Sequence, residues 1–190
     1  MYQEAVRLLC AEGYERTTQH NFVRTNFDYR YERMIADLCP LIGLGANSIS
    51  YSKECIYRNH SDLTQYASAL TKGNLPTRAG HLFDASESPH NYAVRRIEYL
   101  FLNNDDFERQ FGLSLRAAFV EEIKLLEEFN LANIADNNLE LTEDGIYYTS
   151  AVKRTFFHQS AWDRLSEMRP GEFTIERGNF NLPENVHQLA

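Results

Sequence analysis

The residue types that most often carry chemistry are sparsely placed in this sequence of 190 residues. Its three cysteines stand at positions 10, 39 and 55, without the Cys-x-x-Cys spacing of a metal or redox site. No two of its six histidines lie four residues apart, so no helical zinc pair is present. A Gly-x-Ser-x-Gly elbow for a serine nucleophile is also missing. The sequence therefore contains none of these three common signatures.

The first candidate site is the polar run Gln19-His20-Asn21 with Arg24, near the end of a strand predicted over Tyr14–Val23. Ligands of α/β proteins bind where the carboxyl ends of parallel strands meet. The position therefore predicts a substrate-side site. The alternative, that these are solvated polar residues at a strand end, stays open at this point.

The second candidate site is Pro40–Tyr51, which we interpret as a core strand because residues 41, 42 and 44 are apolar. Gly43 and Gly45 interrupt that run, and glycine in a strand lets a ligand or another backbone approach closely. The alternative is a glycine kink that touches no ligand. The order Gly-x-Gly-x-x-Ser comes close to a dinucleotide fingerprint, but Ser48–Tyr51 is typical of a strand rather than of the helix that fingerprint needs. We therefore reject a dinucleotide site.

Composition and charge narrow the class of protein. Apolar residues make up 43% of the chain and charged residues 24%, which is ordinary for a globular protein. We find no apolar run near the ~20 residues of a membrane span and no secretory signal. Few, scattered cysteines suit a reducing compartment, so we expect a cytoplasmic protein without membrane partners. The net charge of −8 argues against nucleic acid as a partner.

The elements that would position these sites alternate in the first part of the chain. We expect helices over residues 2–12 and 29–37 and strands over 14–23 and 40–51. This αβαβ order predicts a parallel sheet covered by helices. Two strands cannot complete such a sheet, so we expect the chain to begin within a domain.

The later part of the chain is mostly helical. We expect a helix over 62–72 with Ser61 as its N-cap, a loop over 75–89, and helices over 92–102 and 116–129 with a short helical turn at 106–111. Two short strands, the second at 139–141, on either side of a turn at 137–138, and a helix capped by Thr142 that runs to 153 complete the order of a winged helix. Carboxylates on 116–129 favour a packing unit over a DNA reader. The predicted core of this module comprises Leu100, Phe119, Ile123 and Leu126.

A series of short motifs follows in order along residues 1–157: Gly13-Tyr14, Asn21-Phe22-Val23-Arg24, Gly43-Leu44-Gly45-Ala46-Asn47-Ser48-Ile49-Ser50-Tyr51, Asn59, Asp62-Leu63, Tyr66, Gly73-Asn74-Leu75-Pro76, Phe107, Phe111-Gly112, Leu125-Leu126 and Leu141-Thr142-Glu143-Asp144-Gly145. This order resembles that of the radical S-adenosylmethionine proteins related to oxygen-independent coproporphyrinogen III oxidase.

The resemblance implies an α+β protein: the end of an incomplete (β/α) barrel followed by a mostly helical, winged-helix-like C-terminal domain. It further implies S-adenosylmethionine and a [4Fe–4S] cluster in the full-length protein, a tetrapyrrole substrate, and a missing N-terminal barrel half as partner. Ile49 matches a residue that contacts S-adenosylmethionine in that family, and Gly43 and Gly45 would allow the approach. We expect the barrel end over 1–56, a connection over 57–91, the C-terminal domain over 92–160 and an irregular tail over 161–190.

Two departures from the family pattern matter. The cysteines lack the Cys-x-x-x-Cys-x-x-Cys order that binds the cluster, so we expect no cofactor on this chain alone and no activity. His20-Asn21 stands where the oxidase has Asp-His. The resemblance therefore implies the C-terminal part of an oxidase-like radical enzyme. The alternatives are a heme or tetrapyrrole chaperone on the same scaffold, or an acidic winged-helix interaction module without ligand.

Overall fold

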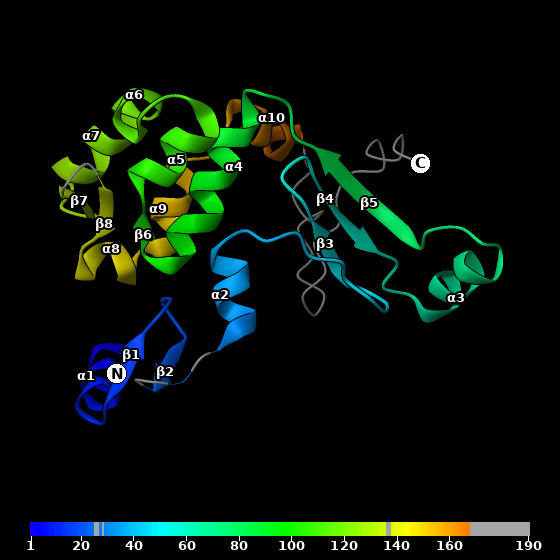
Figure 1. Cartoon of the computed structure of the whole chain (residues 1–190), viewed down its shortest axis with the longest axis horizontal. Helices are drawn as coiled ribbons and strands as arrows, with labels where there is room; N and C mark the ends of the chain where they lie inside the picture. Colours follow the sequence, from blue (N-terminus) through cyan, green and yellow to red (C-terminus); the bar gives the residue numbers. More distant parts are fainter. Residues whose placement is uncertain (25–26, 28, 136–137, 168–190) are drawn as a thin grey trace. The chain divides into compact units, whose positions relative to one another are not determined.

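The computed structural model describes residues 1–24, 27, 29–135 and 138–167 (Figure 1). The chain divides into two compact units. The first joins Met1–Asp37 to Pro89–Phe157, and the second joins Leu38–Ser88 to His158–Ala190, whose described part ends at 167. Both units mix helices with short sheets, as expected of an α+β protein. Among the described residues, no helix is long and apolar enough to cross a membrane.

The first unit begins with a helix and a hairpin. Helix α1 (Tyr2–Ala11) is followed by β1 (Tyr14–Arg16), β2 (Phe22–Arg24) and helix α2 (Arg30–Ala36). The strand predicted over Tyr14–Val23 is wrong, because β1 and β2 pair antiparallel with Tyr14 opposite Arg24. The Thr18 hydroxyl reverses the chain by accepting hydrogen bonds from the backbone N–H groups of His20 (3.2 Å) and Asn21 (3.0 Å).

The second unit is built on an antiparallel sheet of order β3-β4-β5, comprising β3 (Ile49–Tyr51), β4 (Cys55–Asn59) and β5 (Thr77–Leu82). Helix α3 (Leu63–Thr71) lies between β4 and β5 in sequence, and Asp62 rather than the predicted Ser61 is its N-cap. The predicted parallel sheet is wrong, since every strand pair among the described residues is antiparallel. Strand β5 and the start of α4 also replace parts of the loop predicted over 75–89.

The predicted core strand Pro40–Tyr51 is mostly a loop. Only its last three residues belong to a strand, and Leu41 folds back to pair with Tyr51 through two backbone hydrogen bonds of 2.8 Å. Ile42 and Leu44 are 74% and 86% exposed, so the expected burial on both faces is also wrong.

The rest of the first unit surrounds a second antiparallel sheet, of order β6-β8-β7. Thr142 caps α8 as predicted, because its hydroxyl accepts from the Gly145 N–H at 3.0 Å. The elements are α4 (Glu87–Arg96), a 3-10 turn (Ile97–Tyr99), β6 (Phe101–Leu102), α5 (Asn104–Phe111), α6 (Leu115–Ala118), α7 (Val120–Glu128), β7 (Ala132–Ala135), β8 (Asn138–Leu141), α8 (Glu143–Tyr147) and α9 (Thr149–Thr155). Helix α10 (Gln159–Glu167) follows in the second unit, where the start of an irregular tail was predicted, and 168–190 lies outside the described residues.

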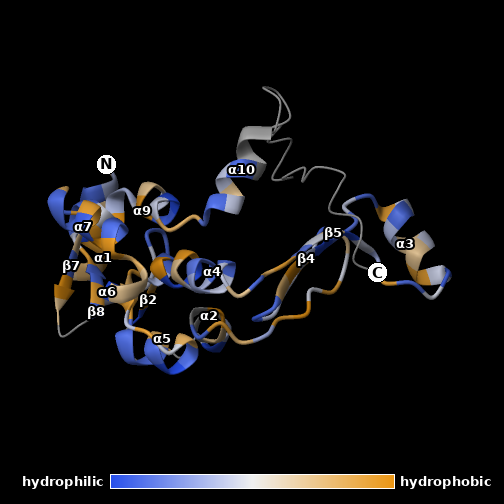
Figure 2. Cartoon of the chain, turned by 90° about the horizontal axis from the view of Figure 1, so that it is seen from above, coloured by the Kyte–Doolittle hydropathy of each residue, from blue (hydrophilic) through white to orange (hydrophobic). Residues whose placement is uncertain are grey.

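The core of this part is aromatic and aliphatic. The Phe119 ring is edge-on to that of Phe156, with their centroids 5.1 Å apart, and its centroid lies 5.5 Å from that of Phe107. All three side chains are fully buried. Burial of Phe119, Ile123 and Leu126 confirms three of the four predicted core residues. Hydrophobic and hydrophilic residues alternate around α7 (Figure 2).

Two features of this core differ from prediction. Leu100 is only half-buried, because it ends the 3-10 turn in a left-handed conformation with φ +70°. The helix predicted over 116–129 is interrupted at Phe119, whose φ of −130° and ψ of 50° separate α6 from α7.

Candidate functional site

The loop between Leu41 and Tyr51 is fixed by one buried side chain. Asn59, at the end of β4, is 4% exposed. Its amide Nδ2 donates to the carbonyl oxygens of Gly43 (3.1 Å) and Gly45 (3.0 Å). Its backbone N–H donates to the Ser48 carbonyl at 2.9 Å. Asn59 therefore holds three points of a loop that lies more than ten residues before it in sequence.

Two hydroxyl groups accept hydrogen bonds from the N–H groups of the same two glycines. The Gly43 N–H donates to Ser50 Oγ at 3.0 Å, and the Gly45 N–H donates to the Tyr66 hydroxyl on α3 at 3.1 Å. Ser48 Oγ donates within the loop to the Leu44 carbonyl at 2.6 Å. The N–H and carbonyl groups of both Gly43 and Gly45 are thus hydrogen-bonded within the protein, and we call this loop over residues 41–51 the platform.

The two glycines are needed by the path of this loop. A Cβ at Gly43 would collide with the Ile49 carbonyl oxygen and lie 2.7 Å from Ser48 Cβ. Gly45 has φ +101°, a conformation that side chains disfavour. The platform leaves Ile42, Leu44 and the 39%-exposed Ile49 with apolar side chains on the surface.

Ile49 faces a row of residues across the sheet. It pairs with Arg58 on β4, which pairs with Ala79 on β5. Side chains directly opposite one another lie on the same face of a sheet. The Nη1 of Arg58 and the Nδ1 of His60 are buried and have no hydrogen-bond partner among the described residues.

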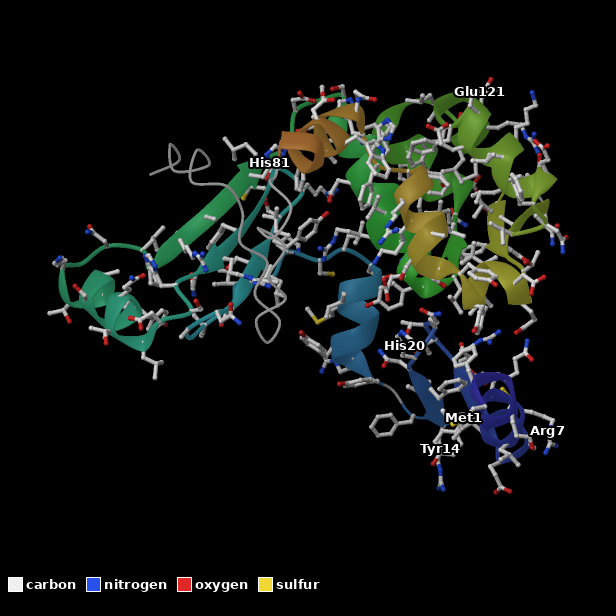
Figure 3. The ribbon with its side chains drawn as sticks, turned by 180° about the vertical axis from the view of Figure 1, so that it is seen from behind. Met1, Arg7, Tyr14, His20, His81 and Glu121 are labelled. Atoms are coloured by element: carbon white, nitrogen blue, oxygen red, sulfur yellow. The ribbon has the colours of Figure 1, made fainter. Side chains whose placement is uncertain are left out.

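The other predicted group, Gln19, His20, Asn21 and Arg24, lies in the first unit. Gln19 is hydrogen-bonded through both its side chain and its backbone. Its Nε2 donates to the Tyr147 backbone carbonyl and its backbone carbonyl accepts from the Tyr2 hydroxyl, each at 2.7 Å. His20 and Asn21 are exposed on the turn of the hairpin, where Figure 3 labels His20.

Arg24 is not part of that turn. It pairs with Tyr14 at the open end of the hairpin. Its guanidinium lies 5.4 Å from the centre of the Tyr14 ring and its Nε donates to the Tyr14 hydroxyl at 3.3 Å. The structure thus brings Gln19, His20 and Asn21 together and places Arg24 away from them.

A third cluster, around Glu87, was missed in the sequence. His81 Nε2 lies 2.8 Å from Glu87 Oε2, and the Ser160 hydroxyl donates to Glu87 Oε1. His158 Nδ1 lies 2.9 Å from Ser160 Oγ. Burial raises the pKa of Glu87, but hydrogen bonds from Ser160, from His81 and from the Asp84 N–H outweigh it and lower the pKa to about 2.

The third cluster has the residue types of a catalytic site, but its pKa and hydrogen bonds favour a structural role. A carboxylate with a pKa of about 2 is a poor base for a serine hydroxyl at neutral pH. Glu87 N–H also donates to Asp84 Oδ1 at 2.9 Å, while the Asp84 N–H donates to Glu87 Oε2 at 3.2 Å. This is a capping box, and its Asp-x-x-Glu spacing was a readable signal. We interpret the cluster as a clamp that joins α10 to the start of α4.

The residues present do not fit an iron–sulfur cluster. Within the described residues no three His, Cys, Asp or Glu side chains gather in a way that could hold a metal ion. Cys10 is exposed in the first unit, whereas Cys39 and Cys55 lie in the second. We therefore assign no chemical step through such a cluster to these residues.

No family model matches the chain. It is 31% identical over 114 residues to the oxygen-independent coproporphyrinogen III oxidase of Pseudomonas aeruginosa, covering 60% of the chain and 24% of that protein. It is 25% identical over 124 residues to the anaerobic coproporphyrinogen III oxidase 1 of Cereibacter sphaeroides, covering 63% and 27%. The solved coproporphyrinogen III oxidase of Escherichia coli, a radical SAM enzyme, matches with a TM-score of 0.67 and 18% identity over 83% of this chain and 40% of that one.

These similarities show the fold first. The chain has the fold of part of a radical SAM enzyme. More particularly, it is related to the oxygen-independent coproporphyrinogen III oxidases, which confirms the resemblance found in its motifs. The chain spans 24% and 27% of the length of the two curated relatives.

Proposed function

We propose that this chain is the C-terminal part of an oxygen-independent coproporphyrinogen III oxidase-like radical SAM protein, inactive alone. The reaction would be the oxidative decarboxylation of propionate groups on a tetrapyrrole. The observation that carries the proposal is that relatives of this kind match over about a quarter of their length, while the three cysteines lack the cluster-binding order. A barrel segment outside these 190 residues would bind the cluster.

In this proposal the Asn59-held platform presents Ile49 to S-adenosylmethionine. When bound with its cluster, that cofactor supplies the radical that starts the reaction. The exposed Ile49 side chain suits an apolar contact with the cofactor, and Gly43 and Gly45 would act by shaping the platform. Ile49→Ala should therefore weaken S-adenosylmethionine binding to the longer protein without lowering its melting temperature. Calorimetric titration showing equal affinity would contradict the contact.

Substrate-side contacts would come from Gln19, His20, Asn21 and Arg24. The exposed turn of the hairpin supports a role for His20 and Asn21, whereas Gln19 would hold the turn through Tyr147. Arg24 on its tyrosine would offer a separate positive charge for a propionate. The predicted segment boundaries at 56, 91 and 160 remain part of this proposal.

The helical part of the first unit would form a winged-helix-like cover for the substrate. Its strand order β6-β8-β7, with α7 directly before β7, supports this comparison. On α7, Glu121, Glu127 and Glu128 are exposed, and Glu127 binds Arg116 at 3.1 Å. A helix with this charge would repel a phosphate backbone, which favours a packing role over nucleic-acid binding.

A second candidate function is the binding and delivery of heme or another tetrapyrrole without decarboxylation. One observation favours it: His20-Asn21 occupies the position of Asp-His in the oxidase. Both residues are exposed on the hairpin turn, so neither is fixed there by packing of the fold.

Anaerobic reconstitution with iron and sulfide tests both functions. We expect the 190-residue chain to show no stoichiometric [4Fe–4S] absorption, and the longer reading frame that contains it to bind a cluster, cleave S-adenosylmethionine and release carbon dioxide from coproporphyrinogen III. Cluster binding by the short chain would overturn the proposal. Tight heme binding by the longer protein without carbon dioxide release would support the second candidate.

A further inference from the structure

The strands of the sheet in the second unit differ in charge from the rest of the chain. Strands β3, β4 and β5 carry two arginines, Arg58 and Arg78, and no Asp or Glu. This composition contrasts with a chain whose net charge is −8. The sheet beside Ile49 is therefore a basic surface in an acidic protein.

Arg58 is the central residue of this surface. It lies between Ile49 and Ala79 across the sheet, so its stem is flanked by apolar side chains. Its Nη1 is buried and has no hydrogen-bond partner among the described residues. A buried guanidinium nitrogen without a partner is unfavourable, because it has lost its hydrogen bonds to water and has formed none within the protein to replace them.

His60 adds a second group of the same kind. The β4–β5 register shifts between Arg58 and Asn59, where β5 carries one extra residue, Arg78. Backbone pairing resumes beyond the shift, since the His60 N–H donates to the Pro76 carbonyl and its carbonyl accepts from the Asn47 N–H, each at 2.8 Å. Side chains two positions apart on an extended strand share a face, at a separation of about 6.7 Å. His60 Nδ1 is likewise buried and unpartnered within the described part of the chain.

The two carboxylates that flank β4 in sequence are engaged elsewhere. Asp62 accepts the Gln65 N–H at 2.8 Å as the cap of α3. Glu54 lies in the turn at the other end of the β3–β4 hairpin and accepts from Ser52 Oγ at 3.1 Å. His81, the remaining titratable group on β5, is bound to Glu87. None of these acids neutralises Arg58.

We propose that Arg58 and His60 form a carboxylate-binding subsite on the face of the sheet next to Ile49. The guanidinium fork matches the planar geometry of a carboxylate, and the adjacent Ile49 and Ala79 suit the apolar part of the same ligand. The subsite itself rests on the sheet geometry. The identity of its ligand rests on the proposed function, which supplies two carboxylates: the methionyl group of S-adenosylmethionine and the propionates of a tetrapyrrole.

The first experiment tests the subsite with sodium propionate as the probe. Melting of the 190-residue chain is compared in propionate and in chloride of equal ionic strength, for the unaltered protein, Arg58→Gln and Lys53→Gln. Lys53 is exposed in the β3–β4 turn, so its variant loses the same charge away from the subsite. We expect propionate to raise the melting temperature by ~2 °C or more in the unaltered chain and in Lys53→Gln, and not in Arg58→Gln.

Melting in chloride separates binding from folding. Because Arg58 Nη1 has no hydrogen-bond partner in the described part of the chain, Arg58→Gln should melt at or above the temperature of the unaltered chain. A large drop would mean that Arg58 stabilises the sheet by itself, and the proposal would be wrong. An equal propionate effect in Arg58→Gln, or none in the unaltered chain, would overturn it too.

The second experiment assigns the ligand. S-adenosylmethionine is compared with 5′-methylthioadenosine, which lacks the carboxylate, and coproporphyrin III with its tetramethyl ester. Arg58→Gln should weaken binding of one acid about tenfold and leave its carboxylate-free partner unchanged. If all four affinities stay the same, the link to the proposed enzyme is wrong. Failed cluster reconstitution in the longer protein would refute the proposed function and leave the propionate result standing.

Discussion

The platform should depend on Asn59 more than on any residue of the loop it holds. Asn59→Ala removes two hydrogen bonds, to the Gly43 and Gly45 carbonyls. It leaves the half-buried Gly43 carbonyl without this donor, whereas the Gly45 carbonyl still accepts from Ser48 Oγ at 2.9 Å. A neutral hydrogen bond contributes about 0.5–1.5 kcal/mol and an unsatisfied buried acceptor costs about 1–3 kcal/mol. Because water can reach part of these carbonyls, we expect a loss of ~2–4 kcal/mol in the free energy of unfolding.

Urea unfolding followed by Trp162 fluorescence measures this loss. Trp162, the only tryptophan of the sequence, lies on α10. It belongs to the second unit, which also contains Asn59. Asn74→Ala is the matched control, since Asn74 is exposed in the same unit and should change stability by less than ~0.5 kcal/mol.

Asn59→Asp sharpens the test. At neutral pH a carboxylate would face the two carbonyl oxygens and destabilise the loop more than alanine does. Protonation would restore a donor, so part of the loss should return as the pH falls. If Asn59→Ala loses less than ~0.5 kcal/mol, or Asn59→Asp matches the unaltered chain at neutral pH, the platform is held in another way.

Three further predictions use the same unfolding measurement. Ile123→Ala should lose ~2–5 kcal/mol because the side chain is 1% exposed, whereas the 43%-exposed Leu125 should tolerate alanine with a loss under ~1 kcal/mol; equal losses would place the wrong face of α7 inside. Gly43→Ala should destabilise more than Gly45→Ala, since the first forces the Ile49 carbonyl to move and the second only strains φ by about 1 kcal/mol; the reverse order would contradict the loop path. Glu87 has a folded pKa of about 2 against 4.5 when unperturbed, so its stabilisation is present above pH 4.5 and is lost as the pH falls toward 2. Over that window Glu87→Gln should show a flatter decline in the free energy of unfolding than the unaltered chain, and parallel declines would show that Glu87 is not the group responsible.

The buried side of α7 and the cap of α8 were predictable because their determinants are local. The spacing of Ile123 and Leu126 marks the buried side of α7, and Thr142 lies directly before the helix it caps. The path of Pro40–Tyr51 was not predictable in this way. Its apolar run suggested burial, but its fold is decided by Asn59 and Tyr66, which lie far along the chain. The short strands β4 and β5 lack a clear alternation of apolar and polar residues, so they could not be predicted from a local pattern.

The candidate sites show the same division. Local sequence identified Gln19, His20 and Asn21 as one polar group, and they share a turn. The position of Arg24 depended on the hairpin register, which the Thr18 hydroxyl sets and the periodicity does not reveal. Arg58 carried no motif at all. Its importance arises only from pairing with Ile49 and from the lack of a partner for Nη1 among the described residues.

The interleaved order of the two units also constrains how the protein can be made and cut. The chain passes from one unit to the other after Asp37, again after Ser88 and again after Phe157. During synthesis the first unit cannot be completed until residues 89–157 have been made. Residues 38–88 of the second unit are therefore synthesised before either unit is complete. A protease that cuts at a single crossing leaves two intact connections, and the fragments stay associated as long as each unit keeps its halves together. Any truncation at residue 88 removes part of both units at once, so neither can be expressed alone as one continuous stretch of this sequence.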